Sequence, residues 1–114
     1  MIEPRLATSV LVGAMIRKAE GEGGFAAVLA KGDETAGAVL VILTERGARP
    51  RLFERILQPD GRYAWEVSAS QPLDGPGEVP DFVARRRRFD PDLWVLELDV
   101  PSGERFAAEM NALG

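Results

Sequence analysis

The chain contains neither cysteine nor histidine. Without cysteine it cannot form disulfides, zinc ribbons, haem attachments or a thiolate nucleophile. Without histidine, the usual serine and cysteine triads lack their general base. Any catalysis would rest on carboxylates, arginines, hydroxyls, Tyr63 or the two lysines, Lys18 and Lys31. The composition favours a protein that is not an enzyme without deciding the question, and it predicts no catalytic residue, metal or cofactor.

Long hydrophobic runs and an excess of positive charge are also missing. The longest apolar run, residues 38–43, has the length of a strand, whereas a membrane span needs ~20 residues. The first residues show no basic segment followed by an apolar stretch, so we expect no secretory signal, no membrane association and a cytoplasmic location. The net charge of −4 does not suit a nonspecific nucleic-acid binder.

What is present is the composition of a globular protein. The 114 residues suit one domain with one hydrophobic core, expected to span residues 1–114. Hydrophobic residues make up 46% of the chain and charged residues 28%, which argues against global disorder.

Hydrophobic periodicity predicts the order helix, four strands, helix, strand, helix. The first helix is expected to begin at a cap, Thr8 or Ser9, and to end near Glu20. Pro80 suits the first turn of the second helix, whose expected apolar face includes Phe82 and Phe89, and Ser102 is the expected cap of the third. The strands are expected at residues 25–31, 38–44, 51–57, 63–67 and 94–100.

These elements predict an α+β fold. Short turns between the first four strands favour an antiparallel meander, and the amphipathic helices must bury their apolar stripes against the sheet. We therefore expect a two-layer sandwich, with a mostly antiparallel five-stranded sheet and the helices on one face. Whether the last strand joins the edge of the meander or inserts into it stays open.

Four consecutive arginines occupy the end of the second expected helix. They could form a docking patch for phosphate or an acidic partner, with an aromatic ring for stacking. They could equally favour the helix dipole and pair with nearby acids, and we weigh this structural interpretation higher. The candidate binding residues are Arg85, Arg86, Arg87, Arg88, Asp90, Asp92 and Trp94.

Two pairs of acids follow the arginines. Asp90 and Asp92 flank a proline and could hold magnesium, although a helix stop followed by a turn explains them better. Glu97 and Asp99 lie two apart on the expected strand, so both point to one face. They could support acid–base chemistry, although a solvated strand face is the commoner reason for such a pair.

Several segments together resemble a known family. They are residues 4–10, 23–26, 31–33 with 36–39, and 88–94 with Glu97. They resemble a small bacterial family of unknown function, seen mainly in alphaproteobacteria, whose most specific element is Asp90-Pro91-Asp92-Leu93-Trp94. The resemblance implies a stand-alone cytoplasmic protein, and it brings no activity, cofactor or catalytic residue.

Three functional hypotheses follow. The first is a small non-catalytic protein-interaction module or homodimer that uses a sheet face or edge and the arginine-rich helix end. The second is binding of nucleic acid or nucleotide phosphate, which requires residues 46–62 and 85–88 to share one face. The third is a carboxylate- or metal-dependent enzyme built on Asp90, Asp92, Glu97 or Asp99.

Overall fold

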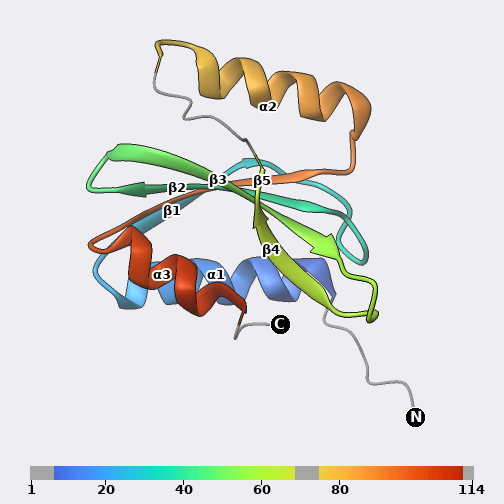
Figure 1. The fold of residues 1–114 in the computed structure, drawn as a ribbon, viewed down its shortest axis with the longest axis horizontal. Coiled ribbons are helices and arrows are strands. Elements are labelled where there is room, and N and C mark those ends of the chain that lie inside the picture. Colours follow the sequence, from blue (N-terminus) through green and yellow to red (C-terminus); the bar gives the residue numbers. More distant parts are fainter. Residues whose placement is uncertain (1–6, 69–74, 112–114) are drawn as a thin grey trace.

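The computed structural model describes residues 7–68 and 75–111. It shows an α+β fold with three helices and five strands in the predicted order (Figure 1). In chain order the elements are α1 (Thr8–Gly21), β1 (Phe25–Ala30), β2 (Val39–Glu45), β3 (Ala48–Leu57), β4 (Tyr63–Val67), α2 (Glu78–Phe89), β5 (Trp94–Val100) and α3 (Gly103–Met110).

The sheet is mixed and largely antiparallel, with the strand order β1-β5-β2-β3-β4. β5 lies between β1 and β2, antiparallel to β1 and parallel to β2. The expected four-strand meander is therefore wrong, because only β2, β3 and β4 form one. The physical reason is burial. β2 and β5 have more buried residues than the other strands, and the centre of a sheet is where both faces of a strand are covered.

The helices cover both faces of the sheet, so the expectation of two layers with all helices on one face is wrong. Figure 1 shows α1 and α3 below the sheet and α2 above it. The alternate residues of β2 and β5 are apolar on both sides, so each face of the sheet needs a cover. Figure 1 thus shows three layers, with α2 alone in its own.

The larger core lies between the sheet and the pair α1 and α3. The expected apolar stripe of α1 is confirmed, since Val12, Met15 and Ala19 are buried there. The expected cap is wrong, because the Thr8 hydroxyl instead donates hydrogen bonds to the carbonyl oxygens of the loop between β1 and β2. The cap of α3 is confirmed, because Ser102 Oγ accepts a hydrogen bond from the N–H of Arg105 at 3.3 Å.

The smaller core lies under α2. Val79, Phe82 and Val83 are half-buried and pack against the sheet, and no residue of α2 is fully buried. The apolar face expected for this helix included Phe89. This part of the expectation is wrong, because Phe89 is 85% exposed. Arg86 faces the sheet in that last turn instead, where its guanidinium pairs with the carboxylate of a strand residue. Among the described residues, no helix is long and apolar enough to cross a membrane.

Candidate functional site

The segment from Asp90 to Trp94 is a structural turn between α2 and β5. Asp90 Oδ1 accepts the N–H of Asp92 at 3.1 Å, as in an Asx-turn. The indole Nε1 of Trp94 donates to the Asp33 carbonyl at 2.7 Å, and Trp94 is 5% exposed. Its ring therefore belongs to the core and is not available to stack on a ligand. Asp90 and Asp92 stay partly or fully exposed at the turn.

Two glycines at the ends of β1 allow it to lie against β5. A Cβ added to Gly24 would stand 1.9 Å from the carbonyl oxygen of Asp99, and one added to Gly32 would stand 2.0 Å from that of Asp92. No side chain fits at either distance. The segments around these glycines are among those that resemble the family, and their role here is architectural.

The structure separates the four arginines of α2. Arg86 points to the sheet and pairs with Glu54 of β3. Arg85 lies on the outer face of α2. Arg87 and Arg88 are exposed and line a groove between α2 and the sheet. The run therefore contributes one structural side chain and three exposed ones, as expected for successive residues about 100° apart on a helix.

The acids of β5 have different surroundings. Asp99 Oδ1 accepts hydrogen bonds from the Thr44 hydroxyl at 2.8 Å and from the N–H of Gly47 at 2.7 Å, so it holds the turn between β2 and β3. Glu97 is half-buried and lines the groove. Within residues 7–68 and 75–111, no cluster of three or more histidine, cysteine, aspartate or glutamate side chains could hold a metal ion.

The groove beside α2 has a volume of about 750 Å³. One wall is the side of α2, and the floor crosses four strands, from β1 through β5 and β2 to β3. The lining residues are Leu29, Ile42, Thr44, Pro50, Val79, Pro80, Val83, Ala84, Arg87, Arg88 and Glu97. The lining is thus mainly apolar, with cations at one end of the α2 wall and a carboxylate on the floor.

The groove exists because α2 is alone on its face of the sheet. Five strands about 4.8 Å apart present a face roughly 19 Å across, whereas a helix is about 10 Å wide. The opposite face is covered by two helices, α1 and α3 (Figure 1). One helix leaves part of the α2 face open, and Leu29, which lies there, is 52% exposed.

Sequence reasoning found only part of this site. Arg87 and Arg88 stood out as members of a run, and Glu97 stood out as one of a pair of acids. Leu29 and Ile42 gave no signal, because apolar residues of strands ordinarily belong to a core, and the sequence does not show that part of this sheet face is left open. The insertion of β5 between β1 and β2 is what places Glu97 beside Ile42 on this surface.

The fold and its half-open face define a small α+β protein with a mixed sheet layered between helices. Residues 6–108 match the model of a family described as "Protein of unknown function (DUF1491)". The chain therefore belongs to the DUF1491 family. The family resemblance in the sequence is thereby confirmed, although the Asp-Pro-Asp-Leu-Trp segment is not shown to be specific to it.

Solved structures share this fold. A crystal structure of a DUF1491 family protein from Caulobacter crescentus is 38% identical, with a TM-score of 0.79 over 90% of this chain and 94% of that chain. The solution structure of a protein from A. tumefaciens is 34% identical, with a TM-score of 0.73 over 87% of this chain and 89% of that chain. No curated protein matches the chain.

Proposed function

We propose that this protein is a non-catalytic protein-interaction module that binds an acidic amphipathic helix of a partner protein. The groove beside α2 is the docking site. The observation that supports the proposal is a sheet face covered by a single helix, next to an apolar groove with two arginines on its wall. The proposal includes a cytoplasmic location, which cell fractionation would test.

The groove suits a helix in width and in chemistry. A helix about 10 Å wide fills the part of the face that α2 leaves open. Its apolar stripe would contact Leu29 and Ile42, as amphipathic helices do in other hydrophobic grooves. Its carboxylates would meet Arg87 and Arg88, which are exposed and able to form charge-assisted hydrogen bonds. Glu97 on the floor of the groove would repel any carboxylates on the other edge of the bound helix. The partner helix would therefore be favoured in the orientation that places its carboxylates at the two arginines.

The nucleic-acid hypothesis requires the two arginine-rich segments to share a face, and Arg51 of the first segment lies on the other side of the sheet from Arg87 and Arg88. The alternation along β3 places Arg51 on the side of α1 and α3, together with Phe53 of the larger core. The Arg51 guanidinium lies next to Gly103 of α3. Arg87 and Arg88 lie on the opposite face, so we do not propose nucleic acid as the partner.

The test uses a designed acidic peptide with apolar residues at helical spacing. Titration into the labelled protein should shift the NMR signals of Leu29, Ile42 and Val83. The double variant Arg87→Glu with Arg88→Glu should weaken binding about tenfold or more, because like charges would then face the peptide. The matched control is Arg85→Glu, which adds the same kind of charge on the outer face of α2 and should leave affinity nearly unchanged.

Two results would contradict the proposal. One is equal binding of a basic peptide with the same apolar pattern, which would show that the arginines do not select the partner. The other is a set of shifts confined to the side of α1 and α3, which would place the docking surface on the other face.

A further inference from the structure

The strand β1 is an edge of the sheet with an unusual surface. Its sequence, Phe-Ala-Ala-Val-Leu-Ala, contains no charged residue and no proline. Phe25 is 54% exposed, Val28 46% and Leu29 52%. Natural proteins usually protect an exposed edge with charges, prolines or a covering segment, because its free N–H and C=O groups invite another strand.

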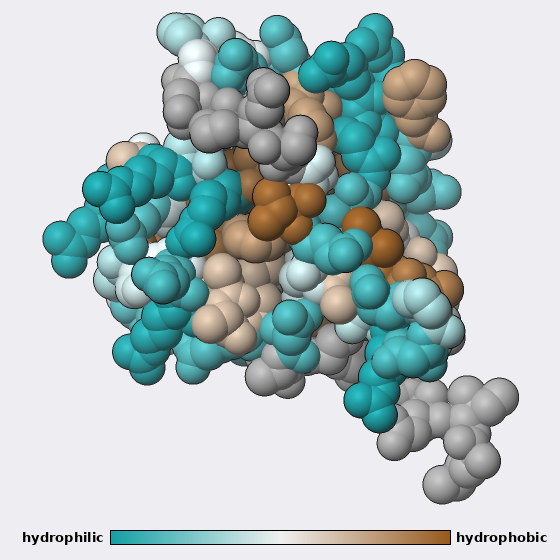
Figure 2. All heavy atoms as spheres, viewed as in Figure 1, coloured by the Kyte–Doolittle hydropathy of each residue, from teal (hydrophilic) through white to brown (hydrophobic). Residues whose placement is uncertain are grey.

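The other edge, β4, differs from β1 in its backbone. Exposed apolar side chains are present there too, since Figure 2 shows hydrophobic atoms in the middle of the face with β3 and β4, and Val67 is 66% exposed. However, the outward N–H of Trp65 already donates to Asn111 Oδ1 at 3.0 Å. Glu66 adds a charge to the middle of β4. The edge at β4 is thus partly closed to a new strand.

On β1 the single irregularity is a bulge at Leu29, between Val28 and Ala30. A bulge disturbs pairing locally. Here it lies near the end of the strand, and residues 25–28 keep a regular register with β5. Four consecutive residues therefore present a regular backbone edge.

We propose that β1 is a self-association strand that pairs antiparallel with β1 of a second copy of this chain. The sequence of β1 complements itself about Ala27. In that register Ala26 lies opposite Val28 of the second copy within the regular residues, and Phe25 lies opposite Leu29, the bulged residue that follows them. Both pairs join residues that share a face of the sheet, as cross-strand neighbours must. Because β1 has no charge, the self-pairing creates no like-charge contact.

The symmetry of this pairing affects the rest of the molecule. Two antiparallel copies of one strand are related by a two-fold axis perpendicular to the sheet, so both α2 helices lie on the same side. Since Leu29 also lines the groove, the two grooves would adjoin across the β1 pair. The self-association depends on the strand edge and does not require the groove to be occupied.

The contact is small. Two six-residue strands bury less than the roughly 1,200 Å² of the smallest stable interfaces. We therefore expect a weak dimer whose population depends on the protein concentration.

The experiment is sedimentation analysis of the purified protein from 5 to 500 µM. The wild type should shift from monomer to dimer across this range. Phe25→Lys with Val28→Lys should remain monomeric throughout, because each lysine would lie opposite an apolar residue of the second copy, Leu29 or Ala26, and charges on an edge strand oppose pairing. Both side chains are about half exposed in the monomer, so the variant should keep its fold, which circular dichroism would verify. The matched control, Val67→Lys on β4, should dimerise like the wild type.

A wild type that stays monomeric at 500 µM overturns the inference, and so does a dimer that survives the two lysines of β1. Loss of the dimer in Val67→Lys would place the contact at β4 and overturn it as well. The variant Arg87→Glu with Arg88→Glu should still dimerise, so failure of the groove proposal and failure of the β1 pairing give different results.

Discussion

Gly24 and Gly32 show how single residues position β1. At each position a backbone oxygen of the segment around β5 occupies the place of a side chain. Gly24→Ala should destabilise the fold by about 2 kcal/mol or more, because the oxygen of Asp99 is backbone and β5 would have to shift. The measurement is chemical unfolding of the variant and the wild type.

Gly21 supplies the matched control. It ends α1, and nothing lies within 4 Å of an added Cβ. Gly21→Ala should leave stability unchanged or raise it by up to about 1 kcal/mol, because alanine is the better helix former. Equal effects of the two substitutions would show that the close approach of Gly24 to β5 is not what constrains this residue.

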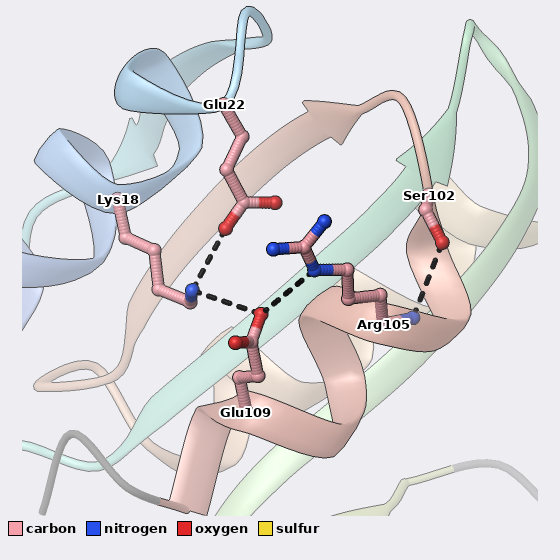
Figure 3. Close-up of polar contacts among 5 residues, drawn as sticks. All are labelled: Lys18, Glu22, Ser102, Arg105 and Glu109. Carbon is pink, nitrogen blue, oxygen red and sulfur yellow. Dashed lines mark hydrogen bonds and ion pairs between the residues drawn. The ribbon is translucent and has the colours of Figure 1, made fainter.

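At the scale of elements, Lys18 joins α1 to α3 (Figure 3). Its Nζ lies 2.7 Å from Glu22 Oε2 and 3.2 Å from Glu109 Oε1. It also lies 5.3 Å from the centre of the Phe106 ring. The hydrogen bond to Glu22 is the main cause that raises the pKa of Lys18 above its usual 10.5, with a smaller contribution from Glu109, and partial burial opposes them.

This shift predicts how stability responds to pH. A raised pKa in the folded state means that the charged lysine stabilises the fold fully below pH 10.5, and that this stabilisation is lost as the pH rises through the folded pKa. Lys18→Met should therefore cost about 1 kcal/mol or less at pH 7. The difference from the wild type should shrink above pH 10.5, as measured by urea unfolding at several pH values.

Lys31→Met is the control for Lys18. The side chains of Lys31 and its partner Glu34 are 66% and 67% exposed, so this substitution should change stability little at any pH. A Lys18→Met penalty that stays constant up to pH 11.5 would show that the alkyl chain of Lys18, rather than its charge, holds the two helices together.

At the scale of the whole molecule, the two faces of the sheet differ in how firmly they are covered. The side of α1 and α3 holds the larger core, whereas α2 has no fully buried residue. We expect α2 to open without unfolding the rest, because local stability follows buried apolar contact. Its amides should exchange with solvent much faster than those of β2 and β5. Arg86→Ala should accelerate this exchange further, since the pair with Glu54 holds α2 to the sheet.

Arg85→Ala is the matched control on the same helix. Arg85 lies on the outer face, so its loss should leave the exchange of α2 close to that of the wild type. If α2 exchanged as slowly as β2, the asymmetry between the two faces would have no effect on dynamics.

Much of the local structure could be predicted from the sequence. The helices and strands lie close to their expected residues, because periodicity and turn residues act over short distances. The partner of Arg86 could not be predicted, since Glu54 is brought near only by the fold. The groove could not be predicted either, because Leu29, Ile42 and Glu97 belong to three strands whose order in the sheet is not written in local patterns.

The sequence by itself determined the elements, the absence of histidine and cysteine chemistry, and the family. Only the tertiary structure decided that β5 enters the sheet between β1 and β2, that α2 lies opposite α1 and α3, and that β1 becomes an edge. The physical reason is that strand pairing and layer packing join residues far apart in the chain. Their free energy depends on which apolar faces can be buried together, and a local pattern of residues does not contain that information.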